Sequence, residues 1–184
     1  MAPTFGRLTA FAIERRKARE VAGDSILGET HRPARRHMRN VPLPAAWLGG
    51  LGLIPFVALS VVAVLGGPEQ TSVAGRALLA YGATILSFLG GIHWGFALTP
   101  LRASESAPLR WGPLIMGVIP QLLGWLALMF TQNHGLWLTS FALVLFVAMD
   151  KDAVTSGAAP PWFLGLRWPL SLLAALCLFV AGST

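Results

Sequence analysis

The stretch Tyr81–Leu98, YGATILSFLGGIHWGFAL, contains no Asp, Glu, Lys or Arg. Together with the apolar residues that begin near Ala74, it reaches the roughly 20 residues that a helix needs to cross a hydrocarbon core of about 30 Å. The run therefore predicts a transmembrane helix over about 74–98. Within it, the short string Leu89–Gly95 combines three glycines with one histidine and one tryptophan, which raises the question of whether the same segment also carries a binding site.

Composition and charge distribution extend this prediction to the rest of the chain. The 184 residues are 54% hydrophobic and only 12% charged, whereas a soluble domain carries about 25% charged residues. Residues 1–44 hold nine of the fourteen basic and four of the eight acidic side chains. This segregation predicts a basic tail over 1–44, largely disordered or amphipathic, followed by a membrane domain over 45–182.

Four more apolar segments have about the length of a membrane span. Pro and Gly within them are tolerated in membrane helices, so Pro120 and Pro169 predict kinks and not breaks. The short connections place successive helices side by side. The sequence thus predicts an all-α membrane protein, a bundle of five transmembrane helices over about 45–65, 74–98, 109–130, 136–149 and 163–182.

The distribution of Lys and Arg predicts the orientation of this bundle. Thirteen of these residues lie in the tail, in the connections after the second and fourth spans, or at the adjoining span ends, Arg167 among them. The opposite side has Arg76 alone. Positively charged residues flank membrane helices on the cytoplasmic side, so we expect the N-terminus inside and the C-terminus outside.

The basic tail and the single cysteine narrow the possible classes of protein. The tail has no zinc-ligand spacing and no recognisable recognition helix, so we expect it to contact anionic lipid headgroups and not nucleic acid. Cys177 has no second cysteine with which to form a disulfide or a metal site. It is expected to act as a small hydrophobic residue.

Small residues recur every four positions along the second span. At about 100° per residue they lie on one face of a helix, and such faces let helix backbones approach closely in lipid. We therefore expect a packing face, with a glycine-lined ligand groove as the alternative. The helix that lies against it could come from this chain or from another. The face consists of Ala83, Ser87, Gly91 and Gly95.

His93 points about 160° away from Gly91 and lies near the inner end of the span. A metal or haem site needs a second ligand at similar depth, whereas His134 lies at the outer side and His31 and His37 lie in the tail. We therefore expect no metal or cofactor. His93 is expected to contact a neighbouring helix or Asp150.

Charged side chains gather at the inner ends of the predicted spans. Asp150 ends the fourth span and Arg167 begins the fifth, and charges near lipid pair with one another. The sequence predicts a structural ion pair between them. The alternative is a binding site for an anionic headgroup or metabolite. Its candidate residues are His93, Trp94, Arg110, Asp150 and Arg167.

The spans contain no nucleophile–base pair, phosphate-binding loop or pair of carboxylates. We therefore expect a protein that is not an enzyme. Gln121 is the strongly polar side chain nearest the membrane centre, and it is expected either to bond between helices or to line a pore in an oligomer.

Four blocks of sequence resemble a known family: LGLIPFVALS at 51–60, YGATILSFLGGIHWGFAL at 81–98, PQLLGWLAL at 120–128 and PPWFLGLRWPLS at 160–171. The family is an uncharacterised group of multi-pass inner-membrane proteins, shared by proteobacteria and mitochondria. The resemblance covers roughly residues 41–182 and implies a five-span inner-membrane protein without an assigned activity. A looser similarity links the Trp-rich PPWFLGLRWP string to the tryptophan-rich sensory proteins, which bind tetrapyrroles.

Three functions remain open from the sequence. The first is a non-enzymatic accessory subunit or assembly factor of a larger complex, with a membrane-protein partner or a second copy of the chain. The second is a membrane protein that binds a small ligand, a tetrapyrrole or a lipid. The third is an oligomeric transporter or channel. The expected location is the cell inner membrane, or the mitochondrial inner membrane in a eukaryote.

Overall fold

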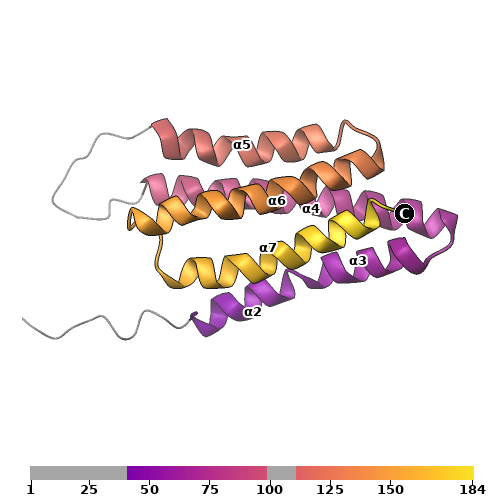
Figure 1. Ribbon diagram of the computed structural model, residues 1–184, viewed down its shortest axis with the longest axis horizontal. Coiled ribbons are helices and arrows are strands. Elements are labelled where there is room, and N and C mark those ends of the chain that lie inside the picture. The colour runs from indigo at the N-terminus through magenta and orange to yellow at the C-terminus, as the bar shows by residue number, and fades with distance from the viewer. Residues whose placement is uncertain (1–40, 99–110) are drawn as a thin grey trace, which may run out of the picture. The chain divides into compact units, whose positions relative to one another are not determined.

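The computed structural model describes residues 41–98 and 111–184. The part of the chain that it describes is helical and contains no strand, as the sequence predicts. The predictions for the tail, His31, His37 and Arg110 fall on residues 1–40 and 99–110, outside the described residues. The helices are α2 (Leu43–Leu51), α3 (Ile54–Leu65), α4 (Pro68–Leu98), α5 (Trp111–Ala127), α6 (Gln132–Thr155) and α7 (Trp162–Ala181) (Figure 1).

Three of the described helical segments are long and apolar enough to cross a membrane. They are Leu43–Leu65, Pro68–Leu98 and Trp162–Ala181, with 23, 31 and 20 residues. The apolar part of α5, Leu114–Ala127, is shorter. In α6 the apolar middle is flanked by polar residues at both ends. The five spans and their orientation stay predictions.

The first predicted span is not one continuous helix, because it breaks between α2 and α3. Pro55 has no N–H to donate to the carbonyl one turn earlier, and its ring crowds that turn. Gly52 and Leu53 form a turn instead. The Tyr81 hydroxyl of α4 donates a hydrogen bond of 3.0 Å to the Gly52 carbonyl that the break exposes.

Helix ends differ from the predicted spans by a few residues. α4 begins at Pro68, six residues before the predicted start, because proline is well suited to the first turn of a helix. The backbone N–H of Gly67 donates to the side chain of Gln70 at 2.7 Å, which closes the turn before it. α6 continues past Met149 to Thr155, so Asp150 lies inside the helix and not at its end. By contrast, α5 and α7 run through Pro120 and Pro169, as expected.

α2 and α3 run in the same direction, and each later helix reverses the direction of the one before it, so one end of the bundle collects the beginnings of α2, α5 and α7 and the ends of α4 and α6 (Figure 1). We call it the charged end, because Asp150 and Arg167 lie there. Four tryptophans lie in the first two turns of these three helices, where an interfacial aromatic belt is expected. They are Trp47, Trp111, Trp162 and Trp168.

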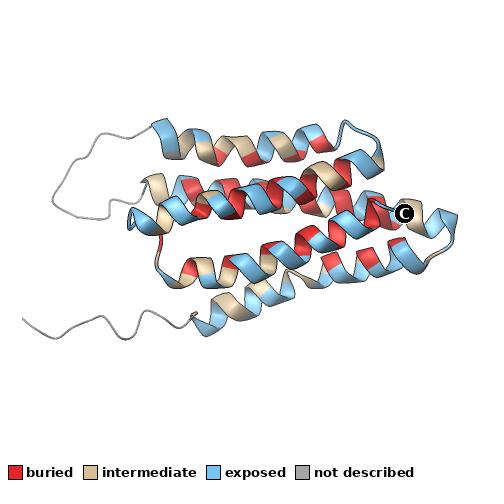
Figure 2. Cartoon of the chain, viewed as in Figure 1, coloured by how far each residue is buried: buried red, intermediate tan, exposed pale blue. Residues whose placement is uncertain are grey.

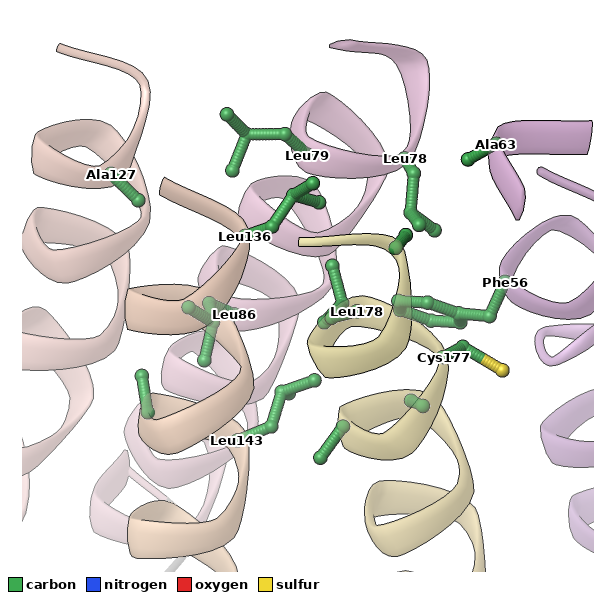
Figure 3. Close-up of a cluster of buried hydrophobic side chains, with 14 of the residues drawn as sticks. Phe56, Ala63, Leu78, Leu79, Leu86, Ala127, Leu136, Leu143, Cys177 and Leu178 are labelled. Atoms are coloured by element: carbon green, nitrogen blue, oxygen red, sulfur yellow. The ribbon is translucent and has the colours of Figure 1, made fainter. Parts of the chain in front are cut away.

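α4 is the central helix and packs against α3, α5, α6 and α7. Its inward side meets large apolar side chains of α6 and α7, and burial is concentrated on these facing sides (Figure 2). Phe56 of α3 packs edge-on against Tyr81 with ring centroids 4.9 Å apart. The fully buried side chains shown in Figure 3 include Leu78, Leu86, Leu136, Leu143 and Leu178.

Candidate functional site

A buried group of charged and polar side chains links three helices at the charged end. Asp150 of α6 is completely buried, and Arg167 of α7 is 8% exposed. The Nε of Arg167 donates to Oδ2 of Asp150 at 2.8 Å. The ion pair that the sequence predicts is therefore present, and it joins α6 to α7 across their connection.

His93 of α4 completes the group. Its Nε2 lies 3.2 Å from Oδ1 of Asp150, which is ion-pair distance. The N–H direction is not aligned on that oxygen, so Oδ1 makes no hydrogen bond. The Nδ1 of His93 lies 3.2 Å from the Leu89 carbonyl. The predicted contact with Asp150 is thus confirmed as a close approach of 3.2 Å and not as a well-aligned hydrogen bond.

Ser171 is a member of this group that sequence reasoning missed. It lies one helical turn after Arg167, and its Oγ accepts a hydrogen bond of 3.0 Å from Nη1 of that arginine. A polar residue four positions after a charged one in an apolar helix was the signal, because such residues share a face. We call His93, Asp150, Arg167 and Ser171 the polar cluster.

The two nitrogens of the His93 ring face two protein oxygens, Oδ1 of Asp150 and the Leu89 carbonyl. A neutral imidazole carries one N–H, so it can donate to only one of these two oxygens, whereas the protonated ring can donate to both. Neither nitrogen points away from the protein toward a vacant position. This geometry argues against His93 as an iron ligand. Among the described residues, no group of three His, Cys, Asp or Glu side chains could hold a metal ion.

Trp94, although adjacent to His93, is not part of the polar cluster. Its Nε1 donates to the Leu114 carbonyl of α5 at 3.1 Å, and its side chain also contacts Gly117. Arg110 lies outside the described residues. Of the five candidate ligand-binding residues, the structure therefore brings together His93, Asp150 and Arg167 and directs Trp94 to the α4–α5 contact.

The predicted packing face of α4 is divided between two environments. Ala83 is buried against Gly124 of α5, whereas Ser87 and Gly91 are exposed. A Cβ added at Gly91 or at Gly95 would meet no atom of the described residues within 4 Å. No described helix of this chain therefore lies against Gly91.

The close approach of α4 to α5 uses glycines that the sequence analysis did not select. A Cβ added at Gly90 would collide with the Gly117 carbonyl, and one at Gly124 would lie 3.0 Å from the Ala83 carbonyl. Gly117 and Gly124 are seven residues apart, so they share one face of α5. This spacing was the signal that could have identified the contact.

An apolar pocket lies beside the polar cluster, between α2, α4 and α7. Its volume is about 360 Å³, within the range of roughly 300–1,000 Å³ that is usual for ligand pockets. Apolar side chains form most of its wall. Arg167 and Ser171 supply its polar side chains, so the cluster and the pocket form one composite site.

Comparison with known proteins places this chain in a family. Residues 41–182 match the model of a family described as "Protein of unknown function (DUF3429)". The chain is 38% identical over 143 residues to transmembrane protein 69 of Xenopus tropicalis, covering 77% of this chain and 54% of that protein. It is 29% identical over 158 residues to transmembrane protein 69 of Mus musculus, covering 85% of this chain and 62% of that protein. The chain thus spans less than two thirds of either relative. No solved structure matches the chain.

Proposed function

The chain belongs to the DUF3429 family of membrane proteins, and we propose on that premise that it is a non-enzymatic accessory subunit or assembly factor of a larger membrane complex. The proposed topology has five spans, with the N-terminus inside and the C-terminus outside, in an inner membrane. The alternating helix directions and the bias of Lys and Arg toward the charged end support this topology.

The observation that carries the proposal is an outward surface on α4 and α5, formed by Ser87, Gly91 and Gln121, which we call the outer face. Ala83 lies against Gly124 and Gly90 against Gly117, so antiparallel packing brings Ser87 level with Gln121. At about 100° per residue, all three residues of the outer face lie on the side of the α4–α5 contact away from α6. All three are exposed.

Gln121 makes this surface unsuited to lipid alone. It lies in the middle of α5, and its side chain makes no hydrogen bond to another described residue. Hydrocarbon offers an amide no partner, and a buried amide without hydrogen bonds costs several kcal/mol, about 2–7 by most measures. The small residues beside Gln121 would let a second helix come close enough to bond with it.

The polar cluster supports a protein that is not an enzyme. The carboxylate of Asp150 is occupied by Arg167 and His93, and it is completely buried. No second carboxylate accompanies it among the described residues of the cluster, and the Ser171 hydroxyl is bonded to Arg167. The cluster is suited to joining α4, α6 and α7, because removing one member of a buried ion pair leaves an uncompensated charge.

Native purification tests the proposal. Full-length protein extracted in mild detergent from its own membranes should co-purify with a partner at fixed stoichiometry, identified by mass spectrometry. Gln121→Leu should reduce the recovered partner, while Leu145→Ala, an exposed position on α6, should leave it unchanged. A lone monomer in mild detergent, without crosslinks in the native membrane, would contradict the proposal.

The pocket beside Arg167 favours a second candidate, the binding of a small ligand. A tetrapyrrole would be held by an axial residue, but both nitrogens of His93 face protein oxygens. A lipid is the better match to an apolar pocket with two polar side chains. Absorbance of the purified protein separates the two: a visible band that disappears in His93→Ala would support the tetrapyrrole.

A further inference from the structure

The pocket between α2, α4 and α7 offers hydrogen-bond donors without matching acceptors. Arg167 uses Nε for Asp150 and Nη1 for Ser171, and its Nη2 donates no hydrogen bond to a described residue. The Oγ of Ser171 accepts from Arg167, which leaves its own hydrogen available. Both side chains line the pocket and are more than nine-tenths buried. A ligand that satisfies them must therefore present acceptor oxygens.

The remaining wall determines the rest of the ligand. Around these two donors the pocket is lined mainly by apolar side chains of α2, α4 and α7, together with Phe56 of α3 and Leu143 of α6, and extends along α7 from Trp162 to Ala174. Such a wall gains free energy by covering an apolar chain. The lining residues include Leu48, Ile85, Phe88, Phe163 and Leu166.

Charge in the cluster favours an acidic head. Arg167 is positively charged, and among the described residues Asp150 is the single carboxylate in contact with it. An acidic head beside Arg167 would accept a charge-assisted hydrogen bond from the guanidinium Nη2, for which no described residue is an acceptor.

The exposed rim shows how a lipid could enter from the bilayer. Leu48 of α2 and Phe88 of α4 line the pocket and are 71% and 63% exposed. The break at Gly52 and Leu53 separates α2 from α3. α2 forms its own wall of the pocket, and these outward apolar side chains place the opening toward the surrounding acyl chains.

We propose that this pocket binds an acidic lipid, with a carboxylate or phosphate oxygen bonded to Nη2 of Arg167 and to the Ser171 hydroxyl. The apolar chain of the lipid extends along α7 toward Ala174. The inference rests on the second candidate function, ligand binding, and specifies its ligand class. It does not depend on the outer face or on a protein partner.

Native mass spectrometry of the delipidated full-length protein tests the binding. Four probes are added separately: oleate, its neutral methyl ester, phosphatidylglycerol and phosphatidylcholine. One equivalent of oleate or of phosphatidylglycerol should remain bound. Which of these two probes binds tells whether the acidic lipid is a fatty acid or a phospholipid. The methyl ester and phosphatidylcholine should bind about tenfold more weakly, since a hydrogen bond to a charged group contributes about that factor. Equal binding of acid and ester would overturn the proposal.

Substitutions in the pocket locate the bound lipid. Ser171→Ala keeps the Arg167–Asp150 pair and should weaken binding about tenfold. Ala174→Phe fills the pocket and should abolish binding, while Leu176→Phe, on the exposed side of α7, should leave it unchanged. Helicity and melting temperature in the same samples verify that each variant folds. Unchanged binding in folded Ser171→Ala and Ala174→Phe would overturn the proposal.

Co-purification of the protein partner, measured on the same variants, keeps this inference separate from the accessory role. Loss of lipid with the partner retained supports the pocket and leaves the accessory role intact. A protein that binds no acidic lipid, with or without a partner, overturns the lipid proposal alone. Visible absorbance that requires His93 would replace the lipid by a tetrapyrrole.

Discussion

The polar cluster and the outer face contain similar side chains in opposite situations. In the polar cluster, Asp150, Arg167 and Ser171 contact one another and are shielded by three helices. On the outer face, Gln121 is exposed in the middle of α5 and makes no hydrogen bond to another described residue. The contacts inside the polar cluster fit a structural role, whereas the outward polar group is where we expect the proposed partner to bind.

The largest expected effect is at the polar cluster. Asp150→Ala leaves Arg167 buried without its carboxylate and should lower the free energy of unfolding by about 3–5 kcal/mol. Unfolding of the full-length protein in mixed micelles, followed by circular dichroism, measures the change. The double variant Asp150→Leu with Arg167→Met removes both charges and should recover much of the loss. Equal stability of Asp150→Ala and wild type would show that the cluster is not structural.

Neighbouring glycines on α4 provide a matched comparison of the two sides of the helix. A Cβ at Gly90 collides with the Gly117 backbone, which cannot move without separating α4 from α5. Gly90→Ala should therefore cost about 1–3 kcal/mol of unfolding free energy. Gly91→Ala meets only open space among the described residues and should change stability by less than about 0.5 kcal/mol. Equal effects would contradict the assigned α4–α5 contact.

The smallest effect on the isolated protein is expected at Gln121. Gln121→Leu should leave the unfolding free energy of the monomer within about 0.5 kcal/mol of wild type. It should weaken association with the partner by about 0.6–2 kcal/mol, the contribution of an interhelical hydrogen bond in a membrane. Sedimentation of the purified complex in detergent measures that association. A monomer destabilised as strongly as by Gly90→Ala would mean that Gln121 bonds within the chain.

The sequence predicts the helical class and the ion pair because each depends on local information. Apolar length predicts helices wherever hydrocarbon excludes other backbone structures. A short connection between α6 and α7 makes Asp150 and Arg167 neighbours whatever the details of packing. The break before Pro55 was missed, since proline is tolerated in many membrane helices and its effect depends on what can donate a hydrogen bond to the freed carbonyl. Here Tyr81 does so.

The packing partners of α4 could not be chosen from periodicity alone. Small residues occur on more than one side of α4: Ser87 and Gly91 lie on one side, and Gly90 lies about 100° away from Gly91. The face that meets α5 depends on the matching glycines Gly117 and Gly124, which belong to a different segment. The pocket also escaped prediction, since it exists only where α2, α4 and α7 come together.

Site-specific photocrosslinking in native membranes tests the central claim, that the outer face contacts a partner, most directly. A benzophenone side chain is introduced at Gln121 and, as a control, at Leu145, which is 55% exposed on α6. We predict one protein adduct of defined mass from position 121 and lipid adducts alone from position 145. Lipid adducts alone from both positions, in folded protein at native abundance, would contradict the claim.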